Sequence, residues 1–324
     1  MTEKKYIVVP AAVLVFVVLF LILENLEPPA NTMLWREIFN AGHAPLFGTL
    51  ALVFLILSLA VFGRKFNFRL WHYITAFVLT VAAGIASELA QILGPRDADP
   101  VDFVRDIIGA VVFLGLYLTF DKKALDAFPS RFREKLPGLR LFLGVIFVLS
   151  FLSVFLMVGA YFERNYIFPK ICTFDTFGLT YFVETHNAEL ESVPPPAAWK
   201  NHDDGRVARV TYRKATYPDI EINEPFPNWS GYDSLTFEVF SPNDTTIRLT
   251  LRIEDARHNN RRDDRFTETF EVPPGFNEIS IPLDRVRRAP AGRLLDMRNI
   301  YAIHLFAYKI EHPLTVYLDN FRMR

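Results

Sequence analysis

The chain has 324 residues, of which 51% are hydrophobic and 31 are phenylalanine, and this is too apolar for one water-soluble domain. The 35 Lys and Arg residues nearly balance the 36 Asp and Glu residues, and neither half is strongly basic, which excludes a nucleic-acid-binding protein on charge. Cys172 is the only cysteine, so a disulfide framework and a cysteine-based zinc site within one chain are also excluded.

The N-terminal half contains apolar stretches long enough to cross a bilayer as helices. We count five, over residues 6–23, 45–62, 70–93, 103–120 and 139–162. No small-residue cleavage site follows the first stretch, so we interpret it as an uncleaved span rather than a signal peptide. The sequence therefore predicts an all-α transmembrane bundle of about five helices over residues 1–162, with the lipid bilayer as its partner.

The distribution of Lys and Arg in short loops predicts the orientation, because these residues resist translocation. Most of the loop cations fall on one side, in the segments 4–5, 64–69 and 122–140. The other side holds only Arg36, Arg96 and Arg105. With five spans, this pattern predicts a multi-pass protein of the bacterial cytoplasmic membrane, with a cytoplasmic N-terminus and an extracytoplasmic, periplasmic C-terminal domain.

Ionisable side chains inside apolar helices are costly, so each one suggests a function. Glu88 shares a helical face with Gly84 and Gln91, and Asp102 shares one with Asp106. All the polar candidates of this half project to one depth near the outer boundary. They are His43, Glu88, Gln91, Arg96, Asp99, Asp102 and Asp106.

The order of these residues, with Pro95 before Arg96 and Gly109 after Asp106, resembles the VanZ-like family of small membrane proteins over about residues 40–115. That family is named for a member associated with resistance to the glycopeptide antibiotic teicoplanin. The resemblance implies a helix layout and a polar site rather than a reaction. Asp106 stands where the family usually has Asn, Asp99 where it has Ser, and Ala44 where an aromatic normally follows the histidine.

Three interpretations of this polar set remain open. In the structural one, Arg96 neutralises carboxylates and Asp102 caps its helix. In the catalytic one, which involves His43, Glu88, Gln91, Arg96, Asp102 and Asp106, Glu88 is an acid or base, Arg96 binds a phosphate and His43 carries a proton. In the third, the set binds or transports a substrate, including a divalent cation held by Glu88, Asp102 and Asp106.

The C-terminal half changes to alternating hydrophobicity, which is typical of half-buried strands. The clearest run is 247–253, with four aliphatic residues facing one way and Arg or Thr facing the other. We expect further strands at 206–212, 235–240, 266–272, 278–282, 300–307 and 314–323. Short strands separated by turn residues predict an antiparallel, all-β jelly-roll sandwich over residues 174–324, joined to the bundle by a linker at 163–173.

Three segments of this half, at 229–239, 274–283 and 316–321, resemble the galactose-binding-like jelly rolls that act as carbohydrate-binding modules. The resemblance implies the fold and a glycan ligand, although such modules have diverse ligands. It also implies a structural calcium ion near Asp319, which matches a position that helps to bind calcium in some related modules.

Sugar recognition needs aromatic faces together with hydrogen-bonding groups in a partly dry site. We expect Trp199, Trp229 and Tyr232 to supply the faces. The polar stretch 255–265 supplies the hydrogen-bonding candidates Asp255, His258, Asn259 and Arg265. Burial of the tryptophans in the core and a solvated hairpin loop are the competing interpretations.

Together the two halves suggest a membrane protein of the bacterial envelope that binds a cell-wall or lipid-linked saccharide and, in one version, modifies or protects it. The alternative is a non-enzymatic recognition module for a glycan or a protein, anchored by its helices. A transporter has little support, since no internal repeat is present. Apart from the calcium ion, the sequence leaves the cofactors open, and it predicts no particular reaction.

Overall fold

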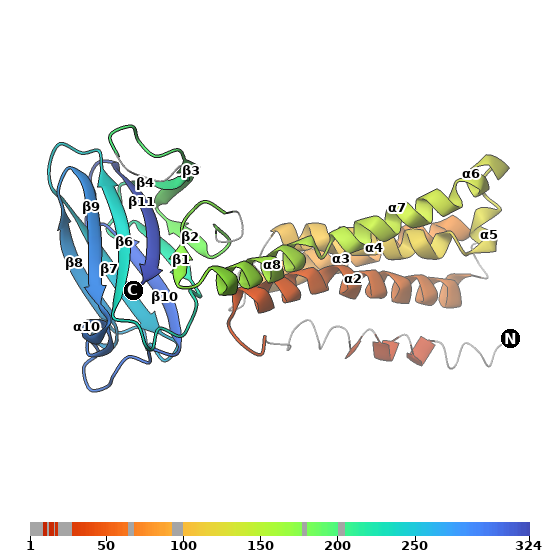
Figure 1. The fold of residues 1–324 in the computed structure, drawn as a ribbon. Helices are drawn as coiled ribbons and strands as arrows, with labels where there is room; N and C mark the ends of the chain where they lie inside the picture. Colours follow the sequence, from red (N-terminus) through yellow and green to blue (C-terminus); the bar gives the residue numbers. More distant parts are fainter. Residues whose placement is uncertain are drawn as a thin grey trace. The chain divides into compact units, whose positions relative to one another are not determined.

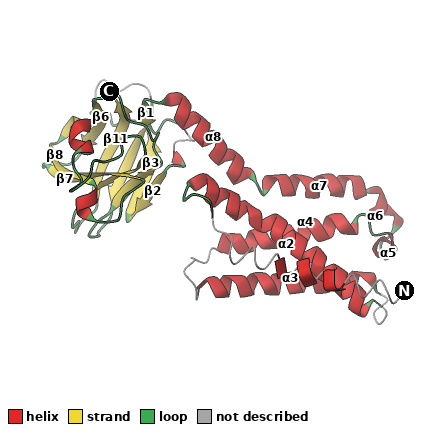
Figure 2. Ribbon diagram, turned by 90° about the horizontal axis from the view of Figure 1, so that it is seen from below, coloured by secondary structure: helices red, strands yellow, loops and turns green. Residues whose placement is uncertain are grey.

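The computed structural model describes residues 9–11, 13–15, 17–18, 28–63, 68–92, 100–176, 180–199 and 205–324. It divides into two compact units, Met1–Leu156 and Met157–Arg324 (Figure 1). The first unit is helical and the second is mainly strand, as Figure 2 shows by colour. Each unit is described by itself below.

The helical unit is built on three long helices, α2 (Met33–Phe62), α3 (Arg69–Ile92) and α4 (Pro100–Leu118). The shorter helices that follow are α5 (Lys122–Leu125), α6 (Ser130–Glu134), α7 (Leu136–Leu149) and α8 (Leu152–Ile167), the last of which continues into the second unit. The helix α2 packs against both α3 and α4.

Small residues allow α2 and α4 to approach closely. Ala44 and Ala110 are completely buried, and a Cβ atom added to Gly109 would collide with the backbone carbonyl of Ala44. A Cβ atom at Gly48 of α2 would likewise run into the ring of Phe113 on α4. Close contact of this kind at small residues is a common way for membrane helices to associate.

The number of helices suited to span a membrane is smaller than predicted. Two described helices qualify, α2 and the segment Arg69–Leu89 of α3, and the number rises to three if α7 and α8 are counted as one broken span. For the described residues the prediction of five spans is therefore wrong. The helix α4 forms, but its 19 residues include the charged side chains of Asp102, Arg105 and Asp106. Most of the first predicted span lies outside the described residues.

The second unit is a sandwich of two antiparallel sheets. The six-stranded sheet has the order β3-β4-β11-β6-β9, with β1 paired to β11, and the five-stranded sheet has the order β2-β5-β10-β7-β8. The strands of the first sheet are β1 (Lys170–Cys172), β3 (Ala188–Val193), β4 (Val207–Tyr212), β6 (Ser234–Ser241), β9 (Gly275–Pro282) and β11 (Leu314–Met323). Those of the second are β2 (Val183–His186), β5 (Asp219–Asn223), β7 (Ile247–Asp255), β8 (Phe266–Val272) and β10 (Ile300–Phe306).

One hydrophobic core fills the space between the sheets. It includes alternate residues of the central strands, such as Leu249, Leu251 and Ile253 of β7. The side chain of Cys172 lies in the same core and is 1% exposed. Because successive side chains of a strand point to opposite faces, the residues between these core positions lie on the side of the five-stranded sheet that faces away from the core. We call this side the outer face, and its central residues are Asp219, Glu221, Arg252, Glu254, His304 and Phe306.

Candidate functional site

The outer face of the five-stranded sheet carries a cluster of charged side chains around His304. In the register of the sheet, His304 lies directly opposite Glu221 on β5 and Arg252 on β7. Phe306, two residues further along β10, lies opposite Asp219. Antiparallel pairing therefore brings side chains from three strands into neighbouring rows.

His304 is surrounded by carboxylates. Its Nδ1 lies 2.8 Å from Asp219 Oδ2, and its Nε2 lies 3.6 Å from Glu221 Oε1 and 3.8 Å from Glu254 Oε1. Burial by itself lowers the pKa of this imidazole, but the facing carboxylates of Asp219 and Glu254 outweigh it and raise the pKa to about 9. Without a ligand, His304 is therefore protonated at neutral pH.

Glu254 is ionised and held in place. Burial favours its neutral form, but the neighbouring His304 and the guanidinium of Arg252 lower the pKa of the carboxyl to about 2. Its Oε2 accepts a hydrogen bond of 2.8 Å from Arg252 Nε and lies 3.2 Å from His258 Nε2. Its other oxygen, Oε1, faces His304.

Aromatic side chains lie beside this charged cluster. Tyr217 precedes β5 and contacts Phe306 and Tyr308, with ring centroids 5.9 and 5.2 Å apart. Tyr217 is 59% exposed and Tyr308 is 52% exposed, so both rings offer a free face to solvent. Exposed aromatic rings next to fixed charged groups are the combination that saccharide recognition needs.

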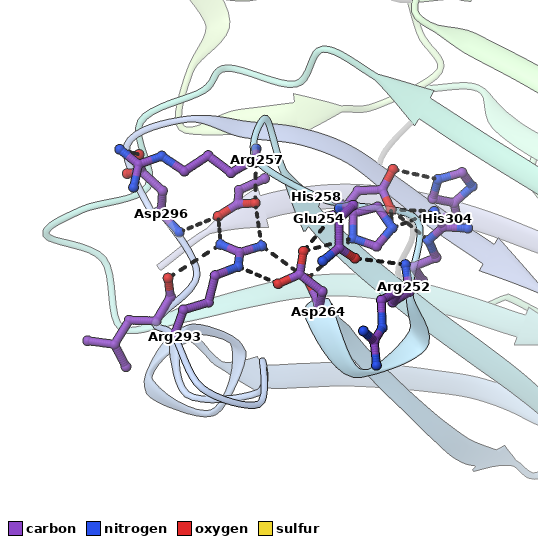
Figure 3. Close-up of polar contacts among 12 residues, drawn as sticks. Arg252, Glu254, Arg257, His258, Asp264, Arg293, Asp296 and His304 are labelled. Atoms are coloured by element: carbon purple, nitrogen blue, oxygen red, sulfur yellow. Dashed lines mark hydrogen bonds and ion pairs between the residues drawn. The ribbon is translucent and has the colours of Figure 1, made fainter.

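A second network anchors the loop that follows β7. Figure 3 shows Arg293 at one end of this network and His304, Glu254 and His258 at the other. Arg293 donates from Nη1 and Nη2 to the two oxygens of Asp255, over 2.6 and 2.9 Å, and it also bonds to Asp264. The side chain of Asp255 is completely buried and accepts a further bond of 2.6 Å from the backbone of Asp296.

Of the predicted sugar-binding residues in this loop, two lie near charged residues of the outer face. His258 lies beside Glu254. The carboxylate of Asp255 accepts hydrogen bonds from Arg293 within the loop network. The side chain of Asn259 accepts a hydrogen bond from the backbone of Arg261. Arg265, just before β8, is partly buried near Arg252 and Glu254. The loop therefore positions His258 rather than presenting a row of free polar groups.

The predicted aromatic faces are placed differently from expectation. Trp229 is fully buried, and its indole nitrogen donates 2.8 Å to the carbonyl of Phe226. Trp199 is 4% exposed and stacks on Phe240 at 5.8 Å. Both tryptophans therefore serve the packing of the sandwich. Tyr232 is half-buried and lines an open cavity of about 670 Å³ away from the outer face.

Asp319, the predicted calcium ligand, is buried on β11 and is 2% exposed. In the described part of the chain, two other groups have the spacing of metal ligands. One is Asp219, Glu221 and His304, and the other is Glu184, His186 and Glu221. In each group the ligand atoms lie within 4.8 Å of one another, and Glu221 belongs to both.

In the helical unit, the structure brings together three of the predicted polar residues. His43 of α2 lies 2.9 Å from Asp106 and 3.7 Å from Asp102, both on α4, and Asp102 also pairs with Arg105. Asp106 is 3% exposed.

The helix α3 approaches the same place. A Cβ atom at Gly84 would lie 3.2 Å from Asp106 Oδ2, and the half-buried Glu88 follows one turn later on the same helical face. Arg96 and Asp99 lie outside the described residues, as does the side chain of Gln91.

Sequence analysis missed the centre of the outer face, namely Tyr217, Asp219, Glu221, Arg252, Glu254, His304, Phe306 and Tyr308. The signal was present, because charged residues alternate with isoleucine or leucine along each of the three strands. Only the strand order shows that these charges are neighbours.

Comparison with known proteins gives structural similarity for the sandwich half. No protein-family model matches the chain, so the VanZ-like resemblance of residues 40–115 gains no support from one, and no curated protein matches it either. Solved structures that resemble the β-sandwich half include an exo-β-agarase (16% identity, TM-score 0.39, 48% of this chain and 25% of that chain). They also include the family 11 carbohydrate-binding module from Clostridium thermocellum in complex with a β-1,3-1,4-mixed-linked tetrasaccharide (18% identity, TM-score 0.36, 48% of this chain and 95% of that module). The match therefore spans about a quarter of the agarase and nearly the whole module.

Proposed function

We propose that this protein is a membrane-anchored saccharide-binding protein whose ligand lies along the outer face of the five-stranded sheet. The observation that carries the proposal is the pairing of exposed rings with fixed charges. Tyr217 and Tyr308 expose their rings and contact each other. Tyr217 also contacts Phe306, which lies two residues from His304 on the same outer face as ionised Glu254 and Arg252.

Each part of the outer face has a role in this proposal. The rings of Tyr217 and Tyr308 pack against the apolar face of a pyranose. The buried carboxylates and Arg252 accept and donate hydrogen bonds to its hydroxyl groups, and such bonds to charged groups are about twice as strong as neutral ones. Neighbouring side chains hold these groups fixed, so little conformational entropy is lost on binding. The apolar helices of the first unit anchor the module in a membrane.

The test is saccharide binding by the full-length protein in lipid nanodiscs. A panel of soluble oligosaccharides, including β-glucan, agarose and peptidoglycan fragments, is titrated by calorimetry. We expect the double change Tyr217→Ala and Tyr308→Ala to weaken binding of the best ligand about 5–150-fold, since each lost aromatic contact costs about 0.5–1.5 kcal/mol.

Phe276→Ala is the matched control. Phe276 lies on β9 of the other sheet and is 52% exposed, the same fraction as Tyr308. We expect this change to leave the affinity unaltered. The proposal fails if no oligosaccharide of the panel binds, or if Phe276→Ala weakens binding as much as the tyrosine changes do.

We infer a second, separate site in the helical unit, at His43, Asp102 and Asp106. The supporting observation is a hydrogen-bonded imidazole and carboxylate buried between apolar helices, which is costly unless it serves a purpose. In this hypothesis the C-terminal half is extracytoplasmic, the site opens to the outer leaflet as the resemblance to VanZ-like proteins suggests, and it binds the head group of a lipid-linked saccharide. The carboxylate of Glu88 then takes part in binding the head group.

Glu88→Gln tests this second site. We expect normal yield and a monodisperse protein, together with loss of binding to a polyprenyl-diphosphate-linked disaccharide in nanodiscs, because the substitution removes a charge but keeps the side-chain size. Glu134→Gln, on the exposed face of α6, is the control. Loss of folded protein would instead support the structural interpretation, and unchanged binding would exclude a role for Glu88.

A further inference from the structure

An unsatisfied nitrogen lies at the centre of the outer face. His304 is 7% exposed, and its Nε2 is buried without a hydrogen-bond partner. Its Nδ1 is already bound to Asp219 Oδ2 at 2.8 Å. A buried nitrogen of this kind costs free energy unless a ligand occupies the space in front of it.

Two carboxylate oxygens face the same nitrogen, and each lies at a distance from it that suits two ligands of one ion. Glu221 Oε1 and Glu254 Oε1 lie 3.6 and 3.8 Å from His304 Nε2, which is too far for a hydrogen bond. Two ligand atoms that are each about 2.0–2.2 Å from one zinc ion at a tetrahedral angle lie about 3.3–3.6 Å apart. Small side-chain adjustments would therefore place an ion between His304 Nε2 and Glu221 Oε1, and these two residues belong to one group with metal-ligand spacing.

Asp219 supplies the remaining part of a metal site. Histidines that bind metals usually donate their other ring N–H to a carboxylate, which fixes the tautomer and turns the free nitrogen toward the ion. The bond from His304 Nδ1 to Asp219 has this arrangement. Asp219, Glu221 and His304 also form one of the two groups with metal-ligand spacing in the described residues.

We propose that the outer face binds one divalent transition-metal ion, of which Zn²⁺ is the best fit, through His304 Nε2 and Glu221, with Asp219 as the positioning residue. An imidazole combined with carboxylates suits Zn²⁺ rather than Ca²⁺ or Mg²⁺, which prefer oxygen ligands alone. The remaining coordination positions of the ion are open to water or a substrate, as one position is in catalytic zinc sites. The proposal stands independently of saccharide binding, since it needs only the protein side chains.

The metal site is tested with tag-free, full-length protein in nanodiscs after treatment with EDTA and removal of the chelator. Zn²⁺ is titrated in competition with a chromophoric chelator. We expect one Zn²⁺ per chain, loss of this binding in His304→Gln and in Glu221→Gln, and an affinity about 10–100-fold weaker in Asp219→Asn. Thermal unfolding in EDTA shows which variants are folded, and Glu221→Gln keeps the side-chain volume if His304→Gln does not fold.

Two histidine controls test whether Zn²⁺ binding is specific to the site at His304. His312→Gln changes an exposed histidine outside the cluster, and we expect it to bind Zn²⁺ as the unchanged protein does. His186→Gln removes the histidine of the neighbouring group that shares Glu221. The proposal is overturned if the unchanged protein takes up no Zn²⁺, if folded His304→Gln binds it equally well, or if His186→Gln alone abolishes binding. Repeating the saccharide titration in EDTA separates this result from the proposed function.

Discussion

Replacing Asp255 with alanine is expected to lower the free energy of unfolding of the sandwich by about 3–5 kcal/mol. The side chain of Asp255 is completely buried and faces the guanidinium of Arg293 with both oxygens. Together with Asp264, it raises the pKa of that guanidinium well above its ordinary value. Without Asp255, Arg293 loses its main partner and the backbone N–H of Asp296 loses its acceptor.

Chemical unfolding of the full chain in detergent, followed by tryptophan fluorescence, to which the buried Trp199 and Trp229 of the sandwich contribute, measures this change. Asp263→Ala is the control, because Asp263 is 54% exposed and its pairing with Arg261 is confined to the surface. We expect the control to change the unfolding free energy by less than about 1 kcal/mol. A similar small loss in Asp255→Ala would contradict the anchoring role of the network.

Gly109→Ala is expected to disrupt the packing of α2 on α4. The added methyl group would meet the backbone carbonyl of Ala44, which cannot move aside as a flexible side chain could. Overpacking of a tight core usually costs about 1–3 kcal/mol, and here the helices themselves must separate. The measurement is the melting temperature of the detergent-purified protein, together with its yield of monodisperse material.

Gly42→Ala is the matched change on α2. No atom lies within 4 Å of a Cβ added at Gly42, and alanine favours a helix over glycine by about 1 kcal/mol. We therefore expect this variant to be as stable as the unchanged protein or more so. If both glycine variants behave alike, the close approach of the two helices is not what holds this unit together.

The sandwich could be predicted from sequence because its strands alternate strongly. Each of the seven runs that alternation indicated corresponds to a strand of the structure, such as 247–253 within β7. The strands β1, β2, β3 and β5, of three to six residues, were not predicted. Alternation identifies a strand, but it does not tell which strands are neighbours.

The candidate site could not be predicted, because it depends on which strands are neighbours in the sheet. Glu221, Glu254 and His304 belong to three strands that are separate in sequence and meet only through the order β5-β10-β7. The predicted sugar-binding role of the large aromatic residues Trp199 and Trp229 does not hold, since both are buried in the sandwich. The same residue type serves a core and a sugar-binding face, so only exposure separates the two.

The predicted number of spans was too high because charges inside an apolar stretch also matter. Hydrophobic length was given more weight than the charges inside a stretch, and α4 carries three of them near its start. His43 on α2 pairs with Asp106 on α4, a contact between helices that spacing within one helix cannot predict. The orientation in the membrane, which was derived from an odd number of spans, stays a prediction.

The single cysteine has a practical consequence for deciding that orientation. Cys172 lies in the sandwich core, and burial raises the pKa of its thiol to about 12, so almost no reactive thiolate exists at neutral pH. The natural chain should therefore be silent toward maleimide reagents while it is folded. A cysteine introduced at any exposed position becomes the sole labelling target, which lets impermeant probes and spin labels report topology and distances without removal of the native residue.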